Sequence, residues 1–180
     1  MQVLDEAHDA IGSAKIDVLV DHLREVADGG HRALVFSQFT GFLARVRARL
    51  DAEGIGHAYL DGSTRDRPAV VQGFKDGDAP AFLISLKAGG VGLTLTEADY
   101  VFILDPWWNP AVEAQAVDRT HRIGQTRHVM VYRLVATATI EEKVMELKER
   151  KASLFTSVLD DEAMLSSPLS ASDIAGLFAD

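Results

Sequence analysis

The sequence predicts an α/β protein in which a parallel sheet of about five to six strands has helices on both faces, a three-layer arrangement. The first observation is that strand and helix patterns alternate along most of the 180 residues. The second is that the strand segments are almost continuously apolar, which is typical of parallel strands buried on both faces. The helical segments, in contrast, place apolar residues at every third or fourth position.

The first part of the chain carries four of these segments. Apolar residues recur at helical spacing from Ile16 to Val26, and Gly29-Gly30 predicts the end of that helix. A strand, a helix closed by Gly54 and a second strand follow at 33–36, 42–50 and 57–60, and the second strand leads into the turn residues 61–64. This order is the start of an alternating strand and helix unit.

The second part continues the alternation. A short helix, a strand, a glycine-rich loop and another strand are predicted at residues 70–74, 81–86, 87–94 and 100–104. Pro110 is a natural first residue for a helix over 110–122. A strand follows over 128–135, and the capping-box pair Thr139 and Glu142 opens a helix that runs to about residue 156. Residues 157–180 read as an acidic tail, in which residues 173–178 could form a short helix.

The formal net charge of −9 belongs to the two ends of the chain. Residues 1–30 hold seven acidic and two basic side chains, and residues 152–180 hold five acidic and no basic ones, so the segment between them has a net charge of +1. The acidic balance therefore does not exclude binding to nucleic acid, which depends on locally placed cations. The chain has no cysteine, which excludes disulfides and thiolate chemistry. Its apolar runs are too short for a membrane span and its start has no secretion signal, so we expect a soluble intracellular protein.

Functional residues are expected where the strands end. In parallel sheets, ligands bind beyond the carboxyl ends of the strands. The loop that follows residue 85 is rich in glycine and contains Lys87, so its backbone N–H groups could approach a phosphate, or its glycines could serve only a tight turn. Trp107 and Trp108 follow another strand end, where they could pack under loops or stack on nucleic acid. The six histidines show no metal-ligand spacing, and we predict no metal site.

Gln115, Arg119 and Arg122 form the most specific pattern. They are four and three residues apart, so all three project from one face of the predicted helix. Such a face can be a solvated basic surface. It can also be an arginine fork that stabilises the charge of a transferring phosphoryl group.

Four segments, in this order and at compact spacing, resemble one known family. They are ALVFSQFT (33–40), LDGST (60–64), SLKAGGVGLTLTEADYVFILDPWWNP (85–110) and QAVDRTHRIGQ (115–125). Together they are similar to the second, RecA-like lobe of the Swi/Snf family of DNA-dependent ATPases, over about residues 12–156. The resemblance implies a protein with two RecA-like lobes that bind ATP between them and move along double-stranded DNA.

The resemblance also implies roles for individual residues. Arg119 and Arg122 resemble arginine fingers, which makes them the expected catalytic residues. With these two arginines, the expected nucleotide-binding residues are Gln115, Gly90 and Gly92. The expected DNA-binding residues are Ser37, Gln38, Asp61, Gly62, Ser63, Ser85, Lys87, Ala88, Gly89 and Trp108. Thr94 and Tyr59 depart from the pattern, since many members have Asn and Arg there.

The remaining expectations concern what lies outside this chain. The sequence contains no GxxxxGK[ST] phosphate loop, and the string LDEAH at residues 4–8 has no apolar strand before it, so it is a coincidental match to a metal-binding box. We therefore expect ATP and Mg²⁺ to be held mainly by an absent N-terminal ATPase lobe of the same protein, a hydrolase of which this chain is one lobe. Residues 1–30 would connect the lobes and lead into this one, 31–156 would form the lobe, and 157–180 its tail.

We further expect a monomer that binds double-stranded DNA, with no membrane association. Its location would be cytoplasmic and nucleoid-associated in a prokaryote, and nuclear otherwise. The isolated chain should not hydrolyse ATP. Two other interpretations stay open: a lobe that binds DNA or a partner without ATP chemistry, and an unrelated Rossmann-like enzyme. The latter predicts a glycine-rich turn after the first strand, where this chain has Phe36-Ser37-Gln38-Phe39-Thr40.

Overall fold

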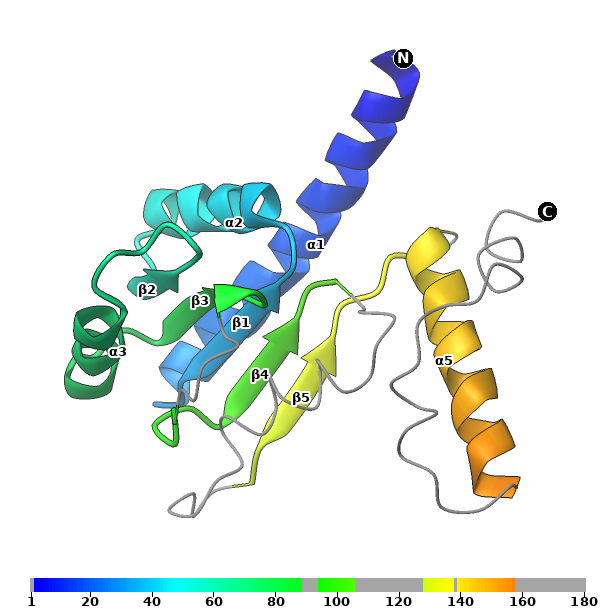
Figure 1. Cartoon of the computed structure of the whole chain (residues 1–180). Coiled ribbons are helices and arrows are strands. Elements are labelled where there is room, and N and C mark those ends of the chain that lie inside the picture. Colours follow the sequence, from blue (N-terminus) through cyan, green and yellow to red (C-terminus); the bar gives the residue numbers. More distant parts are fainter. Residues whose placement is uncertain (1, 89–93, 106–127, 138, 158–180) are drawn as a thin grey trace.

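The computed structural model describes residues 2–88, 94–105, 128–137 and 139–157 (Figure 1). Its centre is a sheet of five strands in the order β2-β3-β1-β4-β5, and every neighbouring pair is parallel. The strands are β1 (Ala33–Ser37), β2 (His57–Leu60), β3 (Ala81–Ser85), β4 (Tyr100–Ile103) and β5 (Met130–Arg133). The parallel α/β fold predicted from the sequence is confirmed, with strand ends within two residues of the predicted ones.

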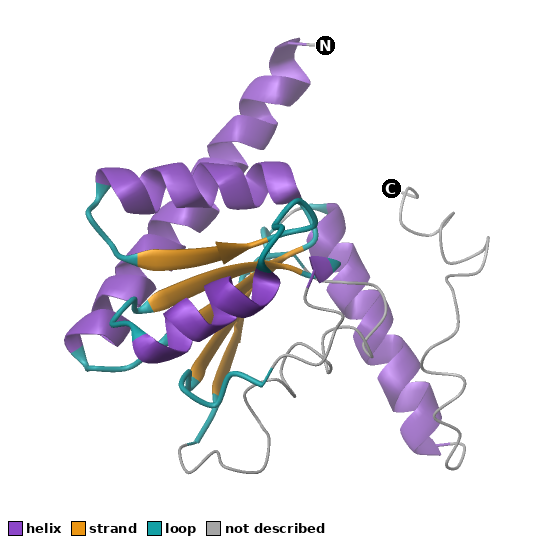
Figure 2. Ribbon diagram, turned by 60° about the vertical axis from the view of Figure 1, so that its left-hand side comes forward, coloured by secondary structure: helices purple, strands orange, loops and turns teal. Residues whose placement is uncertain are grey.

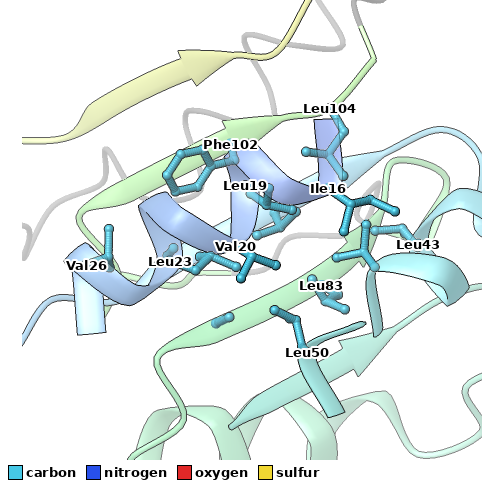
Figure 3. Packing of buried hydrophobic residues seen from close by; sticks show 14 residues of the cluster. Ile16, Leu19, Val20, Leu23, Val26, Leu43, Leu50, Leu83, Phe102 and Leu104 are labelled. Carbon is cyan, nitrogen blue, oxygen red and sulfur yellow. The ribbon is translucent and has the colours of Figure 1, made fainter. Parts of the chain in front are cut away.

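Two helices cover one face of the sheet. They are α1 (Gln2–Asp28) and α2 (Thr40–Ala52), which lie side by side on that face (Figure 2). Buried residues of both helices pack on Val35, Leu83 and Phe102 of the strands (Figure 3). The helical residues in this cluster are Ile16, Leu19, Val20, Leu23, Val26, Leu43, Val46 and Leu50. These are the apolar stripes that predicted the two helices.

Helix α3 (Arg67–Asp76) covers the opposite face. Its buried Phe74 packs in a second cluster with Leu34, Phe36 and Phe82 of the central strands. Because side chains alternate across a strand, the fully buried β1 supplies both clusters, Val35 to the first and Leu34 and Phe36 to the second. The central strands β3, β1 and β4 are thus buried on both faces, which explains why their segments read as continuous apolar runs.

The helix ends follow the glycine signals. Gly30 after α1 and Gly54 after α2 have φ of 71° and 68°, the left-handed region that favours glycine. After α1, the N–H groups of Gly30 and His31 donate to the carbonyls of Ala27 and Val26 at 3.0 and 2.9 Å. This is a Schellman cap, and it turns the chain directly into β1. The start of α1 differs from the prediction: it lies at Gln2, because the segment before Ile16 holds no proline and several alanines, which favour helix without an apolar stripe.

Helix α5 (Ile140–Ser157) follows β5 and lies beyond that edge of the sheet (Figure 1). Thr139 caps it as predicted, since its Oγ1 accepts from the N–H of Glu141 at 3.2 Å. The carboxylate of Glu141 reaches back to the preceding loop, where it accepts from the N–H of Ala136 at 2.9 Å. The predicted helix over 110–122 and residues 158–180 of the tail lie outside the described residues. Among the helices described, none combines the length and apolar character that crossing a membrane requires.

Candidate functional site

Three of the segments singled out in the sequence meet at the carboxyl edge of the sheet. Strands β2, β3 and β1 are neighbours, and they end at Leu60, Ser85 and Ser37. Ser37 and Ser85 are register partners, and Leu60 pairs with Ile84. The residues that follow these ends therefore line one continuous edge, although they come from segments far apart in the sequence.

The turn after β2 is built around Asp61. Its Oδ1 accepts from the N–H and the hydroxyl of Ser63 at 2.8 and 2.6 Å, and its own N–H donates to Oγ1 of Thr64 at 3.0 Å. The hydroxyl of Tyr59 donates to Oδ2 at 3.1 Å. Hydrogen bonds from Ser63 above all, with those of Tyr59 and Thr64, lower the pKa of Asp61 against a smaller opposing effect of burial. Hydrogen bonds among its own residues hold this turn in shape, and Gly62 and Ser63 at its tip are exposed.

The turn after β3 presents a cation. Ser85 is 2% exposed, and its Oγ accepts from the N–H of Ala88 at 3.2 Å. This contact holds the first residues of the glycine-rich loop against the sheet, with Ala88 buried and Lys87 exposed. Lys87 thus stands at the same edge as the tip of the Asp61 turn.

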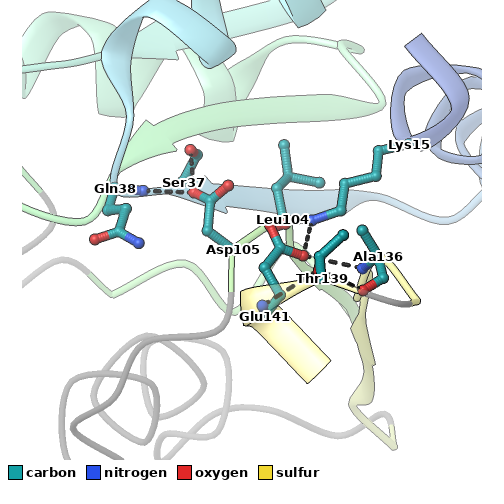
Figure 4. A network of polar contacts seen from close by, with 8 residues as sticks. All are labelled: Lys15, Ser37, Gln38, Leu104, Asp105, Ala136, Thr139 and Glu141. Atoms are coloured by element: carbon teal, nitrogen blue, oxygen red, sulfur yellow. Dashed lines mark hydrogen bonds and ion pairs between the residues drawn. The ribbon is translucent and has the colours of Figure 1, made fainter. Parts of the chain in front are cut away.

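The ends of β1 and β4 are joined by a buried hydrogen-bonded carboxylate (Figure 4). The hydroxyl of Ser37 donates to Oδ2 of Asp105, and the N–H of Gln38 donates to the same oxygen at 2.9 Å. Asp105 is 4% exposed, and this burial raises the pKa of its carboxyl above the ordinary value. The two hydrogen bonds and the charge of Lys15 oppose the rise.

Lys15 of α1 reaches the same place from the other side. Its side chain is 9% exposed, and Nζ donates to the carbonyl oxygen of Leu104 at 2.8 Å. Nζ also forms an ion pair with Oε2 of Glu141, the oxygen that accepts from the N–H of Ala136 (Figure 4). One lysine therefore connects α1 with the exit of β4 and the start of α5.

A cavity of about 600 Å³ lies beside this network. It opens between the start of α2, the exit of β4 and the start of α5, and its apolar walls include Phe39 and Ile140, which are 57% and 46% exposed. Lys15, Arg45, Asp105 and Glu141 supply its charged lining.

The structure thus brings together the predicted residues Ser37, Gln38, Asp61, Gly62, Ser63, Ser85, Lys87 and Ala88. The others lie outside the described residues: Gly89, Gly90, Gly92, Trp108, Gln115, Arg119 and Arg122. In the part of the chain that is described, no three His, Asp or Glu side chains lie together as metal ligands would.

Sequence reasoning missed the two charged residues that hold this network together, Lys15 and Glu141. Lys15 had a detectable signal, since it precedes Leu19 by four residues and so lies beside the apolar face of its helix. Asp105 also had a detectable signal, because it is an acidic residue directly after the apolar run 100–104. Glu141 is one of several acids near the start of α5, and no local pattern distinguishes it.

Comparison with known proteins identifies the family. The helicase conserved C-terminal domain matches residues 14–124, which is more than half of the chain and contains all four motif segments up to Gly124. The chain belongs to this family. Its similarity to the proteins below also confirms two predictions: the chain is of the Swi/Snf type, and it is the second, RecA-like lobe.

Two curated relatives and one solved structure show the similarity. The chain is 42% identical over 172 residues to the ATP-dependent helicase rhp16 of Schizosaccharomyces pombe, covering 93% of this chain and 20% of that protein. It is 38% identical over 172 residues to the SNF2 domain-containing protein ENL1 of Oryza sativa subsp. japonica, covering 89% and 17%. The crystal structure of the C-terminal part of the Fun30 ATPase domain superposes with a TM-score of 0.71 at 38% identity, over 74% of this chain and 44% of that one. The chain therefore spans about a fifth of the length of the curated relatives.

Proposed function

We propose that this chain is the second motor lobe of an ATP-driven translocase of double-stranded DNA. The observation that carries the proposal is the shared carboxyl edge of β2, β3 and β1, where three motif segments of the family stand side by side. Family membership supports the ATP-dependent part, because the relative rhp16 is an ATP-dependent helicase.

The edge offers groups suited to a phosphate backbone. Lys87 supplies an exposed positive charge, and Gly62 and Ser63 form an exposed turn tip that Asp61 holds in shape. Contacts of this kind position a protein on DNA without reading its bases. The side chains of Ser37 and Ser85 are buried, so in this proposal they shape the edge, and Lys87, Ser63 and the side chain of Gln38 contact DNA.

In the same proposal, Arg119 and Arg122 stabilise the negative charge that develops on the γ-phosphate of ATP. ATP and Mg²⁺ are held mainly by an N-terminal lobe that carries the phosphate loop, and Gln115, Gly90 and Gly92 complete the nucleotide site from this side. Closure of the two lobes on ATP and their reopening after hydrolysis give a directional step if the DNA contacts alternate with closure. Residues 1–30, which include all of α1, connect the lobes and lead into this one, and residues 157–180 form a tail.

Substitution of Arg122 tests this proposal in the protein that joins this lobe to its ATP-binding lobe. Arg122→Ala is expected to lower DNA-stimulated ATP turnover by about 10³-fold or more, because it removes charge stabilisation in the transition state. Arg49→Ala is the matched control: Arg49 lies at the far end of α2, paired with Asp17 and Glu53. Turnover of Arg122→Ala within a few-fold of the wild type would overturn the finger assignment and favour a lobe that only binds DNA or a partner.

The isolated 180-residue chain gives a second test. Without the phosphate loop it is expected to show no DNA-stimulated ATP hydrolysis, measured as release of inorganic phosphate. Hydrolysis by the pure chain that Arg122→Ala abolishes would show that the nucleotide site is complete in this lobe and would contradict the two-lobe proposal. The same proposal includes a monomer in solution. It also includes a nuclear location in a eukaryote, or a cytoplasmic, nucleoid-associated one in a prokaryote.

A further inference from the structure

The point at which the chain leaves β4 is held from two sides. On one side, the carboxylate of Asp105 accepts hydrogen bonds from the hydroxyl of Ser37 and the N–H of Gln38. On the other side, Nζ of Lys15 donates to the carbonyl oxygen of Leu104 at 2.8 Å (Figure 4). The last described residues before the segment that carries Arg119 and Arg122, Leu104 and Asp105, are therefore both anchored.

The second anchor depends on one ion pair between distant parts of the chain. Lys15 and Glu141 are 126 residues apart, and their side chains are 9% and 26% exposed. The same oxygen of Glu141 accepts from the N–H of Ala136, in the loop after β5. The pair thus ties α1 to the exits of both β4 and β5, the two strands on either side of the segment that carries the arginines.

A charged pair at this place is better suited to fixing the relative position of the elements it joins than to stabilising the fold. The neighbours of Lys15 on α1, Ile16 and Leu19, pack in the apolar core, and an apolar side chain would continue that packing. Buried ion pairs are often no more stabilising than apolar replacements of similar size. Their hydrogen bonds have fixed directions, however, and here they join α1 to Leu104 and to Glu141 of α5.

We propose that Lys15 and Glu141 are positioning residues that set where the segment carrying Arg119 and Arg122 begins, and that through them the placement of α1 is transmitted to the nucleotide site. This inference rests on the proposed function, in which the two arginines reach ATP on another lobe. It adds a regulatory contact: α1 leads into this lobe, so any shift of α1 acts on the exit of β4 through Lys15.

The test is made in the protein that joins this lobe to its ATP-binding lobe. Lys15→Met removes both contacts of Nζ and keeps an apolar stem of similar length. We expect kcat for DNA-stimulated ATP hydrolysis to fall roughly tenfold to a hundredfold, the cost of misplacing a group by about 1 Å, with KM for ATP and the affinity for DNA changed by less than about twofold. Lys15→Arg, which keeps a donor and a positive charge, should recover most of kcat.

Arg24→Met is the matched control. Arg24 lies on the same helix, and its guanidinium pairs with Asp21 and with Glu53, the residue that follows α2, away from the exit of β4. It should leave kcat unchanged within about twofold. Equal losses in Lys15→Met and Arg24→Met, or no loss in Lys15→Met, would overturn the positioning role. If Lys15→Met does not fold, Glu141→Gln makes the same test, because it keeps an oxygen for the N–H of Ala136 and removes the charge that Lys15 faces.

A measurement on the 180-residue chain provides a readout apart from activity. Lys15→Met should shift the backbone amide signals of Asp105 and Ala136 and of the residues around Arg119 and Arg122 in a nitrogen–proton NMR spectrum, and Arg24→Met should not. Unchanged signals would overturn the inference. The two proposals fail through different results. If Arg122→Ala is active, the arginine-finger role and the positioning role are both wrong. If Arg122→Ala is inactive and Lys15→Met is active, only the positioning role is wrong.

Discussion

The hydroxyl of Ser37, at the end of β1, donates to the carboxylate of Asp105, just beyond β4, and both side chains are buried. The N–H of Phe39 donates in turn to Oγ of Ser37 at 3.0 Å. The hydroxyl of Ser37 therefore already donates one hydrogen bond and accepts another. In the proposed function, contact with DNA from this segment is therefore assigned to Gln38, whose side chain is only partly buried.

Substitutions of Asp105 should separate its charge from its hydrogen bonds. Asp105→Ala leaves the hydroxyl of Ser37 and the N–H of Gln38 without their acceptor in a buried place, which we expect to lower the free energy of unfolding by about 2–3 kcal/mol. Asp105→Asn keeps an accepting oxygen and removes the buried charge, so its stability should stay within about 1 kcal/mol of the wild type. Urea unfolding at pH 7 measures both. Equal losses would show that the charge, and not the hydrogen bonds, is required.

The pH dependence of stability should carry opposite contributions from Asp61 and Asp105. Burial raises the pKa of Asp105, so its folded state holds the proton more tightly, and its contribution to stability falls as pH rises from the ordinary pKa through the folded one. Hydrogen bonds from Ser63 lower the pKa of Asp61, so its contribution is present above the ordinary pKa and is lost as pH falls through the folded one.

Urea unfolding between pH 3.5 and 7 checks this for the wild type, Asp105→Asn and Asp61→Asn. The advantage of the wild type over Asp61→Asn should grow with pH, and its advantage over Asp105→Asn should shrink. Slopes of the same sign for the two variants would contradict one of the two pKa directions.

Two glycines should respond oppositely to alanine. Gly54 ends α2 with φ of 68°, and Gly54→Ala should cost about 1 kcal/mol of unfolding free energy, because a Cβ is strained in the left-handed region. Gly73 lies within α3, and a Cβ there would meet nothing within 4 Å. Gly73→Ala should therefore gain about 0.5–1 kcal/mol, since alanine favours helix more than glycine does. Thermal unfolding measures both, and a gain in Gly54→Ala would contradict the left-handed conformation of Gly54.

The parts of this fold that sequence reasoning predicts are those with local signals. Apolar periodicity indicates the helices, apolar runs indicate the strands, and Gly30 and Gly54 mark helix ends that the structure confirms. That the carboxyl ends of all strands lie at one edge follows from parallel topology, so the Asp61 turn and Lys87 could be expected at the same edge of the sheet. The pairing of Lys15 with Glu141 could not, because nothing in either local sequence selects a partner 126 residues away.

DNA binding by the isolated chain should be weak and strongly dependent on salt. The protein has a net charge of −9, so its attraction to phosphate comes from single cations such as Lys87. Each cation that contacts a phosphate contributes about 0.9 to the slope of log K against log salt concentration. Lys87→Ala should reduce that slope by about 1 for any duplex sequence, because a phosphate contact reads no bases. Lys75→Ala is the control: Lys75 lies in the last turn of α3, where it pairs with Glu97 at 3.6 Å, near the opposite edge of the sheet. Fluorescence anisotropy of a labelled duplex across a salt series measures the slopes, and equal slopes for the wild type and Lys87→Ala would remove Lys87 from the interface.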